Sequence, residues 1–244
     1  MRLYGKNPVL ERIKANPRSI RKLYLQKRTD LSEIVREAKE AGLTFESVDK
    51  KWLKTKCGDG HTQGVMVEVK EFEYVPFAKI LAECLENISI PVFFDGVTDP
   101  QNLGAIIRNI ACLGGFSMVL PEHGSAHVNE TVLRVASGGE NYVNIARVAN
   151  AAAAIKKMKE KGAWIAGAMA SGGEDILKTD LVFPLGIVIG SEGKGIRPGI
   201  RKYLDAGLSL PMRGAALSYN VAVAASIFCY EINRRRRGGS YEMQ

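Results

Sequence analysis

The spacing of apolar residues changes near residue 90, and the change predicts two units of structure. Before it, short apolar segments over 23–25, 44–48 and 64–69 predict strands, and apolar positions at helical spacing over 31–41 predict a helix. After it, continuous apolar runs predict buried strands that alternate with helices. These strands are expected over 92–94, 116–120, 143–148, 164–168, 185–189 and 208–210, and the helices over 102–113, 149–161 and 218–237.

This alternation predicts an α/β protein with a mostly parallel sheet covered on both faces. We expect residues 1–72 to form a small α/β domain, 73–89 a linker with a short helix, and 90–244 a larger α/β domain. The last helix is apolar around its circumference from Val221 to Tyr230, so it should be buried on most sides, within its own domain or against a second subunit. Ser218 is its expected N-cap.

Composition is that of an ordinary soluble protein, with 46% hydrophobic and 25% charged residues among 244. No apolar run approaches the roughly 18 residues of a membrane span, and the first ten residues lack the apolar core of a secretory signal. The four cysteines form no CxxC pair, and His123 and His127 have no acid beside them to complete a metal site. We therefore expect a cytoplasmic protein with no membrane partner, structural disulfide or metal.

Positive charge is concentrated in short stretches of the chain. Residues 1–28 contain nine Lys or Arg and one acid, which accounts for the formal net charge of +8 of the whole chain. Further clusters lie over 50–56 and 234–237. Such patches attract polyanions because each phosphate contact releases a counterion. Charge alone leaves two interpretations open, a nucleic-acid-binding surface and a solvated surface that keeps the protein soluble.

Three polar motifs lie where apolar elements begin or end, which is where α/β proteins keep their chemistry. In the first, Asp99-Pro100 breaks the chain before a helix, and Asn102 is followed six residues later by Arg108. Either Asp99 or Asn102 would cap this helix. Taken alone, an Asn and an Arg on a helix are more often structural than functional.

The second motif, Gly190–Gly195, directly follows an apolar strand and contains three glycines and one acid, Glu192. Glycines at this density allow a ligand to approach the backbone closely. The segment is not a P-loop, because Ile196 stands where that motif requires Lys. In the third motif, Pro211-Met212 ends a short strand, and a loop leads to Ser218-Tyr219-Asn220 at the start of the last helix.

In this order and at these spacings, the three motifs resemble those of the SpoU-type (TrmH-type) RNA ribose 2′-O-methyltransferases of the SPOUT class. The resemblance covers nearly the whole chain and is nearest to the bacterial members that act on guanosine in 23S rRNA. It implies a small RNA-binding domain followed by a domain with a deep trefoil knot, which is an exception to the rule against threaded chains. It also implies S-adenosyl-L-methionine as cofactor and a homodimer formed through the knotted domain.

The resemblance implies roles for individual residues. The catalytic candidates are Arg108, Asn102, Glu192, Ser218 and Asn220. The cofactor-binding candidates are Gly167, Ile189, Gly190, Leu210, Met212 and Tyr219. Two positions depart from the family pattern, because Tyr219 replaces the usual Leu beside the cofactor and Ala222 replaces a frequent Ser.

For RNA binding, the basic N-terminal stretch contributes Arg18, Arg21 and Lys22 as candidates. The loop that contains His61 and Gln63 resembles the one through which the family's N-terminal domain meets RNA, although a plain hairpin loop would have similar residues.

The function implied is methyl transfer from S-adenosyl-L-methionine to a ribose 2′-hydroxyl, in a guanosine of 23S rRNA. Two alternatives remain open at this point. One is a tRNA ribose 2′-O-methyltransferase, and the other is a non-catalytic RNA-binding or ribosome-assembly protein on the same fold, which the departure at Tyr219 keeps in view.

Overall fold

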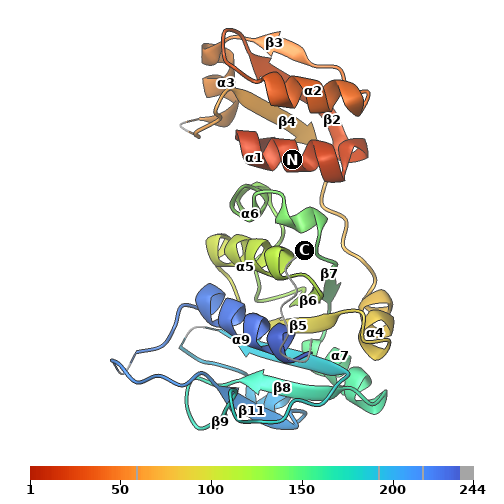
Figure 1. The fold of residues 1–244 in the computed structure, drawn as a ribbon, viewed down its shortest axis with the longest axis vertical. Coiled ribbons are helices and arrows are strands. Elements are labelled where there is room, and N and C mark those ends of the chain that lie inside the picture. Colours follow the sequence, from red (N-terminus) through yellow and green to blue (C-terminus); the bar gives the residue numbers. More distant parts are fainter. Residues whose placement is uncertain (59, 192, 216, 237–244) are drawn as a thin grey trace.

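The computed structural model describes residues 1–58, 60–191, 193–215 and 217–236, which form two domains stacked end to end (Figure 1). The N-terminal domain has a four-stranded sheet in the order β1-β4-β2-β3. Its elements are β1 (Arg2–Tyr4), α1 (Lys6–Ala15), β2 (Ile20–Gln26), α2 (Ser32–Glu40), β3 (Glu46–Val48), α3 (Lys50–Cys57) and β4 (Val65–Val69).

Alternation along β2 and β4 gives the N-terminal sheet two covered faces. Leu23 and Val67 belong to the large core with residues of α1 and α2. Tyr24 and Met66, one position away, face the other side and pack with Leu53 of α3. Successive strand residues point to opposite faces of a sheet, so a helix on each side buries both sets.

In the described residues of the C-terminal domain, seven strands form one sheet in the order β7-β6-β5-β10-β8-β11-β9, and all of its pairs are parallel. The predicted parallel sheet is therefore confirmed. The elements are α4 (Phe77–Leu85), β5 (Ile90–Asp95), α5 (Pro100–Leu113), β6 (Phe116–Pro121), α6 (Glu130–Ala136), β7 (Ile145–Val148), α7 (Ala151–Glu160), β8 (Trp164–Ala168), β9 (Glu174–Asp175), β10 (Leu185–Gly190), α8 (Pro198–Arg201), β11 (Ala206–Ser209) and α9 (Val221–Arg236).

Helices cover both faces of this sheet, and neighbouring strand residues divide between them. Phe94 and Ile189 pack into the core that includes residues of α5, α6 and α9. Phe93 and Val188 pack into a second core with residues of α4, α7 and α8. In Figure 1, α5 and α9 lie side by side in front of the sheet. Threading of the chain into a knot stays a prediction, as do the expected boundaries at 72 and 89.

Four of the helices in the described residues, α1, α3, α6 and α8, were not predicted. Of these, α3 is eight residues long and buries only Leu53, and α6 has seven residues, so neither gives a full period of apolar positions. The predicted N-cap of the last helix was wrong. The helix begins at Val221, and the side-chain Oδ1 of Asn220, not Ser218, accepts a hydrogen bond from the backbone N of Ala222 at 2.9 Å.

The two domains meet where α1 packs against α6 and η2 (Gly139–Asn141). Arg12 and Glu140 form an ion pair at 2.6 Å, with side chains 7% and 0% exposed. Burial raises the pKa of the Glu140 carboxyl, and the charge of Arg12 opposes that rise. Gly138 has a φ of +96°, and a Cβ there would lie 2.3 Å from Cβ of Glu11. The domains are thus in very close contact at this glycine.

The last helix is only partly covered. Residues including Ala225, Phe228 and Ile232 are buried, but Val223, Ile227 and Tyr230 are 46%, 37% and 49% exposed. These three follow one another at spacings of four and three, so they form a stripe on one face of α9. The expectation of burial on most sides therefore fails for this face within one chain.

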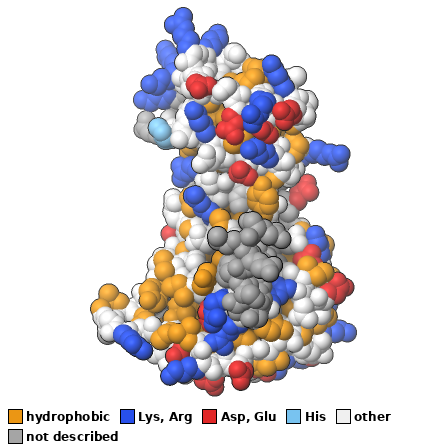
Figure 2. All heavy atoms as spheres, in the orientation of Figure 1, with side chains coloured by type: hydrophobic (Ala, Val, Ile, Leu, Met, Phe, Trp, Pro, Cys, Tyr) orange, Lys and Arg blue, Asp and Glu red, His pale blue; other side chains and the backbone are white. Residues whose placement is uncertain are grey.

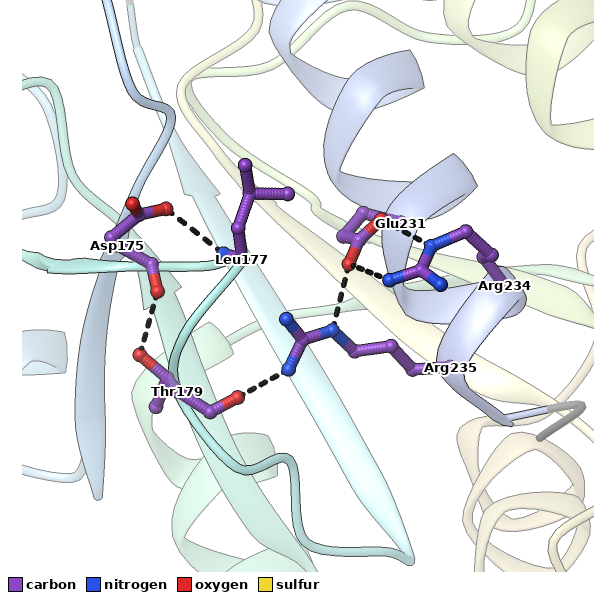
Figure 3. Close-up of polar contacts among 6 residues, drawn as sticks. All are labelled: Asp175, Leu177, Thr179, Glu231, Arg234 and Arg235. Atoms are coloured by element: carbon purple, nitrogen blue, oxygen red, sulfur yellow. Dashed lines mark hydrogen bonds and ion pairs between the residues drawn. The ribbon is translucent and has the colours of Figure 1, made fainter. Parts of the chain in front are cut away.

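The C-terminal end of α9 is fastened to the loop that follows β9 (Figure 3). Glu231 accepts hydrogen bonds from Arg234 and Arg235, and Arg235 Nη1 donates to the carbonyl of Thr179 at 2.6 Å. Asp175 shapes that loop by accepting from the Thr179 hydroxyl and the Leu177 backbone N. The hydrogen bond from Arg234 and, to a smaller extent, that from Arg235 lower the pKa of the Glu231 carboxyl. No helix in the described part of the chain is long and apolar enough to cross a membrane.

Candidate functional site

A cavity of about 250 Å³ lies at the carboxyl ends of β8, β10 and β11, beside the start of α9. In parallel sheets this edge is the usual place for a ligand. The segment between β11 and α9, which projects from the domain in Figure 1, forms one wall. The lining residues are Ala168, Met169, Ala170, Ile189, Gly190, Ser191, Gly193, Gly195, Leu210, Met212, Ser218, Tyr219, Val221, Ala224 and Phe228.

Glycine is required where β10 enters the turn. A Cβ on Gly190 would lie 2.2 Å from the carbonyl carbon of Gly195, because the turn folds back through a bridge between Ser191 and Gly195. Gly193 and Gly195 have φ values of +83° and +63°, which side chains disfavour. At Gly190, Gly193 and Gly195 the turn therefore presents bare backbone to the cavity.

Five of the six cofactor candidates line this cavity, namely Ile189, Gly190, Leu210, Met212 and Tyr219. Gly167 does not. It lies within β8, one residue before the wall, and pairs with Val188 and Gly207 on the two neighbouring strands. A Cβ there would meet the side chain of Leu204 at 2.4 Å, so its small size serves packing in this structure. The binding roles stay predictions.

A second chamber of about 470 Å³ adjoins the first and shares Ser191 and Val221 with it. Asn102 on α5 lies in its wall, and its Oδ1 accepts a hydrogen bond of 3.0 Å from Asn220 Nδ2. Asp99 caps α5 by accepting from Gln101 N at 2.9 Å. The cap is therefore supplied without Asn102, whose side chain joins the start of α5 to the start of α9.

Arg108 is not brought to either chamber within one chain. It is exposed on α5 and lines none of the cavities described here. Six residues of helix place its Cα about 9 Å along the axis from Asn102. Its backbone is packed, because a Cβ on Gly139 of η2 would lie 3.0 Å from Cα of Arg108. Glu192 falls outside the described residues.

A hollow of about 660 Å³ in the N-terminal domain brings together His61 and Gln63 with Lys6, Lys50 and Lys54. The sequence showed Lys50 and Lys54 as a charge cluster but gave no sign that they surround the His61 loop. Gln63 Oε1 also accepts a hydrogen bond of 2.7 Å from the backbone N of Lys6.

The other RNA candidates lie elsewhere in the N-terminal domain. Arg18 lines a hollow of about 460 Å³ at the domain junction, and Arg21 and Lys22 are exposed on β2. Figure 2 shows Lys and Arg side chains gathered over the N-terminal domain. No group of three or more His, Cys, Asp or Glu able to hold a metal occurs within the described ranges.

Sequence reasoning missed an ion pair beside the second chamber. Asp95, at the end of β5, is 1% exposed in its side chain and pairs with Arg197 at 2.6 Å. Lys194 and His123 line the same chamber. The two paired residues are 102 positions apart, so no local pattern indicated them.

Comparison with known proteins matches both parts of the chain. Residues 89–230 match the SpoU rRNA methylase family, and residues 2–75 match the RNA 2′-O ribose methyltransferase substrate-binding domain. A relative from Shewanella oneidensis, named 23S rRNA (guanosine-2′-O-)-methyltransferase RlmB, is 35% identical over 96% of this chain and 97% of its own. A relative from Bacillus subtilis, named putative TrmH family tRNA/rRNA methyltransferase YacO, is 34% identical over 95% and 94%.

Solved structures agree at the level of the fold. The SpoU methyltransferase AviRb from Streptomyces viridochromogenes, described in complex with the cofactor AdoMet, superposes with a TM-score of 0.81, at 22% identity, over 98% of this chain and 91% of its own. An AdoMet-bound rRNA methyltransferase from Sinorhizobium meliloti gives 0.78, also at 22% identity, over 96% and 87%. The predicted fold class is therefore confirmed. Together with the two domain matches and the relatives above 30% identity, these findings establish that the chain belongs to the SpoU rRNA methylase family.

Proposed function

We propose that the protein transfers a methyl group from S-adenosyl-L-methionine to the 2′-hydroxyl of a guanosine ribose in 23S rRNA. The observation that carries this proposal is the contact of Asn102 with Asn220 beside a cavity walled by the Gly190 turn. Residues from three distant motifs thereby meet at one edge of a parallel sheet. The choice of 23S rRNA as the substrate rests on relatives named 23S rRNA (guanosine-2′-O-)-methyltransferase.

The cavity suits this cofactor. Its walls combine apolar side chains such as Ile189, Leu210 and Phe228 with the exposed backbone of the glycine turn. An adenine ring needs apolar packing and main-chain hydrogen-bond partners, which is the common plan of small-molecule pockets. Tyr219 lines the cavity and is 45% exposed, so it is open to a ligand that enters there.

S-adenosyl-L-methionine would supply an electrophilic methyl group, so that the ribose oxygen forms the new C–O bond as the S–CH₃ bond breaks, S-adenosyl-L-homocysteine leaves and the hydroxyl proton passes to solvent. The chain's own residues position the ribose and stabilise the charge that develops on its oxygen. We assign the electrostatic role to Arg108. It is not a base, because a neutral arginine at pH 7 would cost about 7 kcal/mol. Asn102 and Asn220, fixed by their mutual hydrogen bond, form the wall against which the ribose is placed.

The N-terminal domain points to rRNA as substrate, in preference to tRNA. The relatives named 23S rRNA methyltransferases align over 96% and 97% of this chain, including this domain. Two neighbours whose descriptions name tRNA, one concerning C/U34 and one from A. aeolicus, cover 62% and 67% of it. The basic hollow around His61 and the Lys residues of α3 would hold the rRNA backbone away from the target. We place this activity in the cytoplasm, where ribosomes are assembled.

We further propose a homodimer formed on the exposed face of α9. Val223, Ile227 and Tyr230 form an apolar stripe, and Leu177 and Val182 are 54% and 53% exposed on the loop that Arg235 fastens to α9. Figure 2 shows hydrophobic side chains gathered on this part of the C-terminal domain, and Figure 3 shows Leu177 beside α9. A second copy covering this face would remove the stripe from water. It would also set α5, with Arg108, against the partner.

The decisive experiment supplies labelled S-adenosyl-L-methionine and rRNA or tRNA from a strain that lacks the protein, and then maps the modified ribose. Methylation of one guanosine in 23S rRNA is the expected result. Modification of tRNA alone would replace rRNA as the substrate. Failure of the folded protein to bind the cofactor in calorimetry would favour a non-catalytic RNA-binding role.

Dimerisation is tested by light scattering with Ile227→Lys beside the wild type. The wild type is expected to have twice the mass of one chain, and the variant to be a monomer with an unchanged circular dichroism spectrum. Mixing Arg108→Ala with Asn220→Ala then asks whether both residues must lie on one chain. Recovered activity in the mixed dimers would place Arg108 against the partner's cavity, and a monomeric wild type would overturn the dimer.

A further inference from the structure

A buried carboxylate holds an exposed arginine at the mouth of the second chamber. Asp95 accepts two hydrogen bonds from Arg197, from its backbone N at 2.8 Å and from Nε at 2.6 Å, and its Oδ1 forms an ion pair with Nη2 at 2.6 Å. The Asp95 side chain is 1% exposed, whereas that of Arg197 is 64% exposed. The guanidinium is therefore fixed on one edge while most of its surface faces solvent.

This geometry resembles a prepared anion site more than a stabilising ion pair. The pair is one-sided, because Asp95 is buried whereas the outer part of the Arg197 guanidinium faces water. A guanidinium held by its Nε edge, however, keeps Nη1 in a defined position, and arginine presents planar, bidentate donors to phosphate. Fixing the side chain in advance removes part of the entropy that binding would otherwise cost.

Arg197 also lies on the boundary between two hollows. The second chamber shares Arg197 and His123 with a third hollow of about 390 Å³, lined also by Pro121, Asn150 and Gly199. Because the second chamber also shares Ser191 and Val221 with the cofactor cavity, the three hollows adjoin one another in a row, and this row is called the groove below. A strand whose ribose lies at the cavity would continue along this groove.

Among the residues that the structure describes, the formal charges that line the groove balance, two cations against two acids. Lys194 and Arg197 line it, with His123 between the two outer hollows. The acids in its described walls are Asp95, which is paired with Arg197, and Asp99, which caps α5. Asp95 is buried behind Arg197 and Asp99 caps α5, whereas Lys194 and Arg197 are exposed and are the donors that a phosphate can reach.

We infer that this groove binds the RNA backbone next to the methylated nucleotide, with Arg197 holding the adjacent phosphodiester and Asp95 positioning Arg197. Lys194 and His123 face the same strand. This inference rests on the proposed function, but it concerns binding of a phosphodiester and not the chemistry of transfer. It gives the C-terminal domain its own RNA contacts, separate from the basic hollow around His61.

The test compares Arg197→Lys, Arg197→Ala and Asp95→Asn with the control Lys157→Ala. Lys157 is exposed in the second half of α7, whereas the start of α7 lines the third hollow. A fragment of 23S rRNA is titrated by filter binding at several salt concentrations, and cofactor binding is measured by calorimetry. Arg197→Ala is expected to weaken RNA binding about tenfold or more and to reduce the salt slope by about one, with cofactor affinity unchanged.

The conservative variants separate positioning from charge. Arg197→Lys keeps the charge but loses the fork, so the salt slope should stay near that of the wild type while affinity falls. Asp95→Asn should raise KM for RNA more than it lowers kcat. The control should match the wild type.

The inference is overturned if Arg197→Ala lowers the melting temperature and cofactor affinity together but leaves the RNA salt slope unchanged, because the pair would then only join the loop to β5. Loss of the proposed function would give a different result. The wild type would then fail to methylate rRNA, whereas the binding difference between Arg197→Ala and the control would persist.

Discussion

The two sides of helix α5 are built in different ways. Toward α9 the contacts are polar. Asn102 accepts from Asn220, Asn109 donates to Ser226 at 2.8 Å, and the carbonyl of Leu113 accepts from Asn233 at 3.0 Å. Toward α6 and η2 the helix relies on glycines. A Cβ on Gly104 would lie 2.6 Å from Cβ of Val135, and Gly139 touches the backbone of Arg108.

The difference shows how one helix serves both domains. Directional hydrogen bonds fix the register of α9 against α5 and so hold Asn102 and Asn220 beside the cavity. Close backbone packing at Gly139 fixes η2, and Glu140 within η2 forms the ion pair with Arg12 of the N-terminal domain. The same short segment, η2, therefore contacts both Arg108 and the N-terminal domain. The following changes test each side separately.

Replacing Arg108 with Ala should have the largest effect, a loss of methyl transfer of about a thousandfold, because a single donor to a developing oxyanion contributes on that scale. The Arg108 side chain is exposed, so stability should change little. Single-turnover rates with saturating cofactor measure the loss, and calorimetry should give unchanged cofactor binding. Retained turnover would remove Arg108 from the mechanism.

Glu140→Ala should destabilise the domain junction by about 3–5 kcal/mol, since it leaves the buried Arg12 without its counter-ion. Hydrogen exchange should rise in α1 and η2 and stay unchanged in α9. The double variant Arg12→Met with Glu140→Leu serves as control, because an apolar pair of similar volume should recover much of the loss. Equal exchange in both single and double variants would show that the pair does not hold the domains.

Gly104→Ala should cost about 1–3 kcal/mol, because the added methyl group overlaps Val135. Asn109→Ala, on the polar side of the same helix, should cost about 1 kcal/mol for one hydrogen bond. Urea denaturation measures both. If Asn109→Ala proved the more costly, the glycine side would not be the tighter one.

The smallest expected effect is on the pH dependence of the unfolding free energy, to which Glu231 on α9 and Glu140 at the domain junction should contribute with opposite signs. The folded-state pKa of Glu231 is lowered by Arg234 and Arg235, so its contribution is present above the ordinary value of 4.5 and is lost as pH falls through the folded value. Burial raises the pKa of Glu140, so its contribution is full below 4.5 and is lost as pH rises through the folded value. Urea denaturation of Glu231→Gln and Glu140→Gln, measured on both sides of pH 4.5, should change the slope of unfolding free energy against pH in opposite directions.

The sequence predicted the features that depend on local pattern. Short continuous apolar runs such as 116–120 and 185–189, which alternate with predicted helices, are typical of buried parallel strands, so the sheet was predicted from them. The meeting of Asn102 and Asn220 was expected only through the family resemblance, since nothing in their spacing places α5 against α9.

Contacts between distant residues were not predictable in the same way. Arg12 and Glu140 are 128 residues apart and look like ordinary surface charges in the sequence. Ser218 was predicted as the N-cap, but Asn favours that position as much as Ser does. The sequence therefore could not decide between Ser218 and Asn220, and the start of the helix at Val221 does. Arg108 was correctly placed on its helix, but its distance from the cavity depends on three-dimensional packing and assembly.

The glycine at position 138 makes the union of the two domains vulnerable to a single nucleotide change. Any larger residue there would act as a wedge against Glu11, pushing the domains apart while leaving the interior of each intact. For protein engineers, the same point offers a way to uncouple RNA capture from methyl transfer without rebuilding either half.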